Sequence, residues 1–186
     1  NYEEGKCGYV NTKGEEVIPF SFYTADPFSE GLAAVGVDLP KEEGRQSAET
    51  RYGYIDKKGG WVIEPKYRNA YAFQDGLAKV EDTDRNIGYI DKTGKEVIPL
   101  RYREITDFRN GKAFAQEKSG EVILIDTTGK KLKSIITGKY MREHGNGIIS
   151  IEAEEQVAPG RVEYVRLYFD ENGRVSETDA EWRMRL

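Results

Sequence analysis

Short apolar segments alternate with turns along the whole chain. Tyr9, Tyr54 and Tyr89 each precede a β-branched residue and lead into a turn of the form Asx-x-x-Gly. Aromatic and β-branched residues favour strands, and a Val-Ile pair with a proline close behind follows each turn. Proline cannot donate a hydrogen bond to a neighbouring strand, so it ends the second strand. The pattern predicts a β-hairpin at each of these places.

The predicted hairpin turns share one chemistry. An Asp or Asn side chain accepts a hydrogen bond from backbone two residues on, and glycine supplies positive φ at the end of the turn. This combination predicts a type I turn with a glycine bulge. The five Asx positions are Asn11, Asp56, Asp91, Asp126 and Asp170. Because they recur in every unit, turn chemistry explains them better than calcium binding or acid–base catalysis does.

A third apolar segment follows each hairpin after a connection of about ten residues. It begins with Phe-x-x-Gly and continues with Leu-Ala or Lys-Ala, at residues 28–33, 73–78 and 108–113. Two weaker copies follow, so the repeats begin near residues 8, 53, 88, 123 and 167. With no helical period in the chain, we predict a single all-β domain over residues 1–186, built from five tandem three-stranded meanders.

The motif Gly-Tyr-Ile-Asp-x-x-Gly, followed by Val-Ile-x-Pro and Phe-x-x-Gly-Leu-Ala, resembles the WG repeat of bacterial proteins. One position departs from that family. The Trp that precedes the first Gly is replaced here by Cys7, Tyr52, Ile87, Val122 and Arg166. The resemblance implies a bacterial, tandem, β-rich module, in a family whose members mostly have no assigned function.

The two ends of the chain favour one arrangement of the meanders. The first copy begins at its hairpin and lacks a preceding Gly-Leu-Ala strand, whereas residues 182–186 alternate apolar and basic side chains as a strand does. If these residues pair beside Tyr9, they close a five-bladed propeller-like ring and leave no bare sheet edge. An open β-solenoid is the alternative.

The composition limits the kinds of site and partner that the chain can have. The 186 residues include one Cys and one His, so we expect no internal disulfide, no metal site rich in Cys or His and no cofactor. A net charge of −5 argues against nucleic acid as a partner, and no apolar run is long enough for a transmembrane segment. The 20 glycines and 12 tyrosines follow from the repeats, because both types recur within the motifs.

Two of the spacings between successive repeats are longer than the others. In both, about ten extra residues lie in the same connection, after the third strand of a unit. Insertions at equivalent places of a repeat protein often form its binding face, although surface loops also tolerate extra polar residues. The candidate ligand-binding residues there are Glu42, Glu43 and Arg45 in the first insertion and Glu154, Glu155 and Arg161 in the second.

Aromatic residues near the variable loops are the other candidates. Trp61 and Tyr71 could stack on a sugar or anchor a peptide, as could Tyr23, Tyr67, Tyr102 and Tyr140. Tyr67 and Tyr102 recur at the position of Phe22, which also fits packing between units.

His144 and Cys7 are each the sole residue of their type. His144 stands where other copies carry phenylalanine, so we expect a half-buried packing residue that could still serve in acid–base work. Cys7 lies in no recognisable nucleophile motif and is expected to be a small apolar filler.

We therefore expect a non-catalytic binding module that presents loops on a rigid repeat scaffold to a protein or cell-envelope partner. The alternative is a carbohydrate-binding or glycan-cleaving domain that uses loop aromatics and two of the loop glutamates. The chain starts at Asn1 with neither Met nor a signal peptide, which suggests a processed or trimmed form. The family resemblance favours the bacterial cell envelope or secretion, and a cytoplasmic location is also compatible with the absence of disulfides.

Overall fold

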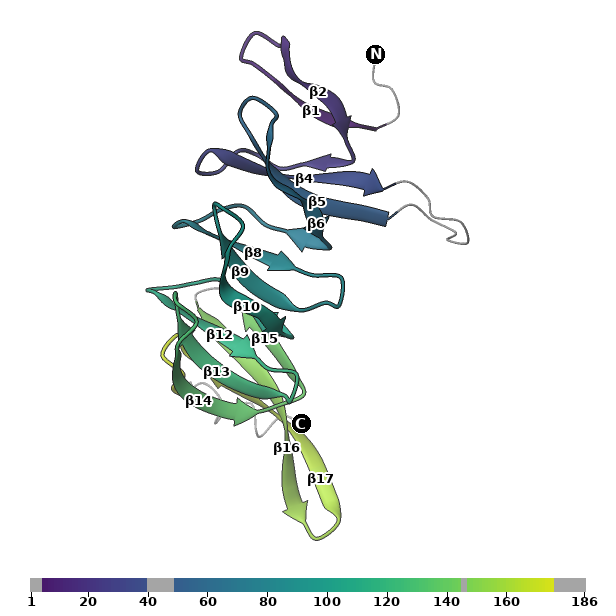
Figure 1. The fold of residues 1–186 in the computed structure, drawn as a ribbon. Coiled ribbons are helices and arrows are strands. Elements are labelled where there is room, and N and C mark those ends of the chain that lie inside the picture. The colour runs from purple at the N-terminus through teal and green to yellow at the C-terminus, as the bar shows by residue number, and fades with distance from the viewer. Residues whose placement is uncertain (1–4, 40–48, 145–146, 176–186) are drawn as a thin grey trace. The chain divides into compact units, whose positions relative to one another are not determined.

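The structure is a computed structural model that describes residues 5–39, 49–144 and 147–175 (Figure 1). Every regular element among these residues is a strand, and all strand pairs are antiparallel. The prediction of an all-β tandem-repeat fold is therefore confirmed. The ring closure predicted for residues 182–186 lies outside the described residues, so the ring and its solenoid alternative both stay predictions.

The described strands form five small sheets. The first sheet pairs β1 (Cys7–Val10) with β2 (Glu16–Phe22). The second runs in the order β3 (Thr24–Ala25), β4 (Leu32–Leu39), β5 (Glu49–Asp56) and β6 (Trp61–Tyr67). The third contains β7 (Asn69–Ala70), β8 (Leu77–Glu81), β9 (Ile87–Asp91) and β10 (Glu96–Tyr102). The fourth contains β11 (Glu104–Ile105), β12 (Lys112–Gln116), β13 (Glu121–Asp126) and β14 (Lys131–Thr137), and the fifth β15 (Tyr140–His144), β16 (Ile148–Ala158) and β17 (Arg161–Phe169).

Each complete sheet combines strands from two sequence copies. The Gly-Leu-Ala strand β4 pairs with β5 of the next copy, where Ala34 lies opposite Tyr54. The same shift pairs β8 with β9, where Lys79 lies opposite Tyr89. Two-residue strands, β3, β7 and β11, add a fourth strand that the sequence motifs do not predict.

The hairpin turns confirm the predicted Asx chemistry. In each copy the Asx Oδ1 accepts hydrogen bonds from the N–H groups two and four residues on; at Asp56 these come from Lys58 and Gly60 at 2.8 and 2.9 Å. Gly59 ends the turn at φ 82°. Equivalent bonds occur at Asn11, Asp91, Asp126 and Asp170.

The glycine before each motif tyrosine is required by a bulge in the next strand. A Cβ on Gly88 would lie 2.5 Å from the Ile98 carbonyl oxygen, and a Cβ on Gly8 would lie 2.7 Å from the Ile18 oxygen. The Val-Ile-x-Pro strand arches over this position, so only a residue without a side chain fits.

β2, β6 and β10 continue past Pro19, Pro65 and Pro99, so the prediction that proline ends the second strand is wrong. The proline lies in the bulged part of the strand, where a missing backbone donor is tolerated.

A second glycine turn recurs in the connection before each Gly-Leu-Ala strand. Asp75 and Gly76 both have positive φ, and Gln74 and Leu77 exchange backbone hydrogen bonds across them. This is the two-residue hairpin turn that Asp-Gly and Asn-Gly favour. The same turn occurs at Glu30 and Gly31 and at Asn110 and Gly111.

Alternate residues of β4 pack on opposite faces of its sheet. Ala33 and Val35 join a core with Ile18 of the first sheet, whereas Leu32 and Ala34 join a core with Phe73 of the third. This arrangement follows from the period of two along a strand, and it explains why the strand is apolar at every position from Leu32 to Val35.

The motif tyrosines link neighbouring sheets. The Tyr54 ring lies 4.9 Å from that of Phe73, and its hydroxyl donates a 2.8 Å hydrogen bond to the Tyr71 carbonyl. Burial raises the pKa of Tyr54 far above its ordinary value. Tyr9 makes the same pair of contacts with Phe28 and the Asp26 carbonyl.

The residues group into two compact units, Asn1–Leu100 and Arg101–Leu186. The border falls inside β10, so it does not coincide with a border between sequence copies. That residues 1–186 form one domain stays a prediction.

Candidate interaction site

The second insertion lengthens a hairpin and is not the loop that the sequence suggested. β16 and β17 pair without a break from Ile149 opposite Phe169 to Gln156 opposite Val162, and Pro159 and Gly160 form the turn. We call residues 153–165 the arm; it is the yellow-green hairpin of Figure 1. The extra residues continue the ladder already formed by β16 and β17, which is why they adopt strand structure.

The candidate residues of the arm are placed along these two strands. Glu154 is exposed in β16 and lies opposite Tyr164, and the backbone of Glu155 lies opposite Glu163. Arg161 begins β17 and forms a 2.6 Å ion pair with Glu163.

The first insertion also lies between two paired strands. Leu39, the last residue of β4, lies opposite Glu49, the first residue of β5. The candidates Glu42, Glu43 and Arg45 lie outside the described residues.

The two faces of the sheet β15–β16–β17 differ in chemistry. One face presents Ile149, Ile151 and Phe169, which pack on Phe114 and Leu124 of the neighbouring sheet. The opposite face carries the alternate residues of each strand. These include Tyr140 and Arg142 in β15, Glu152 and Glu154 in β16, and Val162, Tyr164 and Arg166 in β17.

Two exposed tyrosines and two cations gather on this second face. The Lys139 ammonium lies 5.5 Å from the centre of the Tyr140 ring and 5.6 Å from that of Tyr164. The Arg103 guanidinium lies 5.3 Å from the Tyr140 ring, and its NH1 group donates a 3.0 Å hydrogen bond to the Lys139 carbonyl. Tyr140 and Tyr164 remain 50% and 55% exposed. We call these four residues the tyrosine–cation cluster.

Several lysines and arginines in the described part of the chain form ion pairs, but the cations of the cluster are not among them. Among the described residues, neither Arg103 nor Lys139 forms an ion pair. Nearby, Arg166 lies 3.9 Å from a carboxylate oxygen of Glu152. The cluster is therefore a positive patch on a chain whose net charge is −5.

The predicted pair Trp61 and Tyr71 lies elsewhere, and each contacts a different partner. Trp61, 37% exposed at the start of β6, packs edge-on against Phe22 with ring centres 6.0 Å apart. Tyr71 is 51% exposed, and the Lys79 ammonium lies 5.1 Å from its ring.

The other aromatic candidates divide into two groups. Tyr67 and Tyr102 are buried like Phe22, so their shared position serves packing. Tyr23 and Tyr140 are about half exposed.

His144 is half-buried, as predicted. Its Nε2 lies 2.7 Å from the Ser150 hydroxyl, and its ring lies 5.6 Å from that of Tyr168 in the same sheet. β15 extends to His144, so the ring packs within its own sheet, whereas Phe73 packs against the preceding one. Cys7 is also half-buried and packs beside Ile18 and Phe22.

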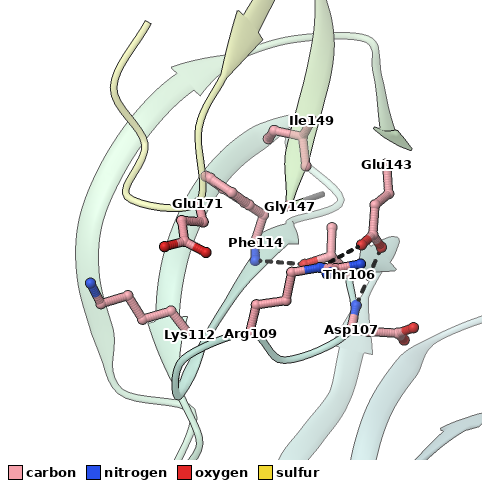
Figure 2. A pocket seen from close by; sticks show the side chains of 9 residues that line it. All are labelled: Thr106, Asp107, Arg109, Lys112, Phe114, Glu143, Gly147, Ile149 and Glu171. Atoms are coloured by element: carbon pink, nitrogen blue, oxygen red, sulfur yellow. Dashed lines mark hydrogen bonds and ion pairs between the residues drawn. The ribbon is translucent and has the colours of Figure 1, made fainter. Parts of the chain in front are cut away.

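A small hollow lies between the β11–β12 connection and the fifth sheet (Figure 2). Its volume of about 10 Å³ suits a single water molecule. Arg109 and Glu143 form a 3.5 Å ion pair at its wall, and the Thr106 hydroxyl accepts a 3.0 Å bond from the Phe114 N–H. The hollow contains none of the candidate residues, and its charges already have partners, so it supports structure more than ligand binding.

Hydrogen bonds within the turns lower the pKa of three of the turn carboxylates, Asp56, Asp91 and Asp126. Hydrogen bonds from the Gly60 and Lys58 N–H groups lower the pKa of Asp56, and bonds from Thr93 lower that of Asp91. Over the described ranges, no three His, Cys, Asp or Glu side chains are placed to hold a metal ion together. No helix in the described part of the chain could cross a membrane.

A family model for the WG-containing repeat matches residues 8–38, 52–84 and 87–120, more than half of the chain. The chain belongs to the WG-containing repeat family. The matched segments are the three copies with the complete motif, and the WG-repeat pattern continues structurally in the Asx turns at Asp126 and Asp170. None of the curated protein sequences matches this WG-repeat chain.

Several solved structures resemble this WG-repeat protein at low sequence identity. The computationally designed Ika8 protein is 15% identical, with a TM-score of 0.47 over 91% of this chain and 54% of its own. The WD40 β-propeller domain of Doa1 is 15% identical, with a TM-score of 0.43 over 88% and 57%. BamB from Moraxella catarrhalis is 11% identical, with a TM-score of 0.41 over 78% and 48%. The WG-repeat chain thus spans about half the length of these proteins.

Sequence reasoning included Tyr140 but missed Tyr164, Lys139 and Arg103. A signal for Tyr164 was present, because Val162, Tyr164 and Arg166 alternate with period two and so share one strand face. Lys139 and Arg103 belong to different strand connections and carry no local signal.

Proposed function

We propose that this WG-repeat domain is a non-catalytic binding module that holds a protein partner against the tyrosine–cation cluster. The observation that carries the proposal is the pair of half-exposed tyrosines, Tyr140 and Tyr164, which lie beside Lys139 on a sheet whose other face is packed in the core. Tyrosine and arginine are the residue types that most often dominate protein interfaces.

Rigidity favours such a site. A tyrosine side chain has only two χ angles and so loses little conformational entropy on binding, which leaves more of the interaction energy for affinity. The arm extends the same face with Val162, which is 50% exposed, and so adds apolar contact area beside the rings. The expected location in the bacterial envelope or outside the cell belongs to this proposal.

A carbohydrate ligand is the alternative, because exposed tyrosine rings also stack on sugars. Glycan cleavage would in addition need two converging carboxylates. Of the four loop glutamates considered, only the side chain of Glu154 lies within the described structure.

The test is affinity capture from the native organism with the immobilised chain. The double variant Tyr140→Ala/Tyr164→Ala should lose the captured partner, whereas Tyr71→Ala should retain it. Tyr71 is a matched control, since it is equally exposed and also lies beside a lysine. Melting temperatures should confirm that each variant folds.

Two results would contradict the proposal. Capture that survives the double variant would show that the cluster is not the binding site. Binding of the purified chain to a glycan array, lost in the same double variant, would favour the carbohydrate alternative.

A further inference from the structure

We propose that the tyrosine–cation cluster recognises an acidic segment of its protein partner, rich in aspartate or glutamate. This inference rests on the proposed function and specifies the chemistry of the partner. The charges around the cluster and the contacts of its two cations support it.

Several cations on this acidic chain have a carboxylate beside them. Lys92 pairs with Glu30 at 3.0 Å, Lys131 with Glu121 at 2.6 Å, and Arg51 with Glu49. In the described part of the chain, Arg103 and Lys139 have no such partner, and Arg142 projects on the same face as Tyr140. Carboxylates from another molecule would complete these pairs.

The Tyr140 ring brings two positive charges together at a surface that an acidic segment of a partner could reach. Arg103 and Lys139 both lie over the Tyr140 ring, so their charged groups are held on one exposed side chain. Arg103 uses NH1 for the Lys139 carbonyl, and a guanidinium has further N–H donors for a carboxylate. An acidic segment crossing this ring can therefore meet two cations without reordering them.

One carboxylate on the face opposes such a ligand. Glu154 is exposed and lies directly opposite Tyr164 in the arm. Glu152 is closer to the centre of the sheet and is compensated by Arg166. Removing the charge of Glu154 should therefore strengthen the binding of an acidic ligand at the arm end.

The experiment measures fluorescence anisotropy of a labelled peptide of alternating Glu and Gly, with a Gln and Gly peptide as the neutral probe. The full chain should bind the acidic peptide and not the neutral one, and raised salt should weaken the binding. The double variant Arg103→Gln/Lys139→Gln should weaken it by about tenfold, and Glu154→Gln should strengthen it by about twofold. Lys79→Gln, which removes the lysine beside Tyr71, is the matched control and should change nothing.

Each failure has a separate meaning. Equal binding of both peptides, no binding of the acidic one, or indifference to the Arg103/Lys139 variant would overturn the acidic-segment inference. If capture of the native partner still depends on Tyr140 and Tyr164, the proposed binding function survives that result. Single-stranded DNA that competes as well as the acidic peptide would point to a general polyanion site and would also overturn the inference.

Discussion

Two sheet-to-sheet junctions of this chain fulfil the same structural task with different residues. Between the second and third sheets, Tyr54 inserts its ring beside Phe73 and bonds to the Tyr71 carbonyl. Between the fourth and fifth sheets, Leu124 takes the position of Tyr54 and packs with Ile149. The first junction combines apolar packing with a directional hydrogen bond, whereas at the second the equivalent residue has no hydroxyl to donate one.

The sheets that precede the two junctions also differ in the size of a bulge. In the second sheet, the two-residue step from Tyr52 to Tyr54 in β5 is matched by a four-residue step in β6, from Tyr67 back to Ile63, so β6 arches over Gly53. In the fourth sheet the bulge is smaller, since the step from Val122 to Ile123 is matched by two residues of β14. The smaller bulge leaves room for a side chain at residue 123. The glycine of the repeat motif is therefore required only in those copies where the neighbouring strand arches over it.

The largest effect should come from filling the space under the bulge. Gly53→Ala would place a Cβ against the Ile63 carbonyl and 2.8 Å from the Pro65 nitrogen, so we expect a loss of about 3 kcal/mol in unfolding free energy. Chemical denaturation measures it. Gly60→Ala is the control and should cost far less, since the nearest atom to its Cβ would be 3.5 Å away. Equal effects of the two variants would refute the role assigned to the bulge.

An intermediate effect is expected when one junction receives the residue of the other. Tyr54→Leu removes the contact with the Phe73 ring and the hydrogen bond to Tyr71, and should cost about 2 kcal/mol. Tyr54→Phe retains the ring and should cost about 1 kcal/mol. Denaturant midpoints of the two variants separate the contribution of ring packing from that of the hydrogen bond. If the Phe variant were as unstable as the Leu variant, the hydrogen bond would account for the whole loss and ring packing for none of it.

The smallest effect concerns the Asx turns, which both units share. The pKa of Asp91 is lowered in the folded chain, chiefly by the Thr93 hydroxyl, so its ionised form favours folding. That contribution is complete above the ordinary Asp value of 3.8 and is lost as pH falls through the lowered value. Asp91→Asn should therefore flatten the fall in stability below about pH 4, measured by urea denaturation across acidic pH. The variant should retain the turn, because Asn11 shows that asparagine forms the same one. If the fall in stability at low pH were unchanged in the variant, the Asp91 carboxylate would not be its cause.

Features that depend on neighbouring residues in the sequence could be predicted. Asp56 and Gly59 define their turn within four residues, and the prediction is correct at every copy. The turn at Asp75 and Gly76 has an equally clear signal in the sequence, although only a connection of about ten residues is predicted there.

Features that depend on pairing between distant residues could not be predicted. The arm at Glu154 and Arg161 consists of polar residues whose strand structure comes from continuing an existing ladder. Lys139 reaches Tyr140 and Tyr164 from outside their strands, so no spacing in the sequence indicates the cluster.

The pairing of each Gly-Leu-Ala strand with the next copy's hairpin determines how the array can be shortened or exchanged. Removing residues 68–102 would take out β7 to β10 as a set and leave every remaining strand beside its native neighbour. Removing residues 53–87, one sequence copy, would instead force β4 to pair with β9. The modular unit for recombination is the sheet. Its natural junctions lie between the last strand of one sheet and the first of the next, at Tyr23, Arg68, Arg103 and residues 138–139.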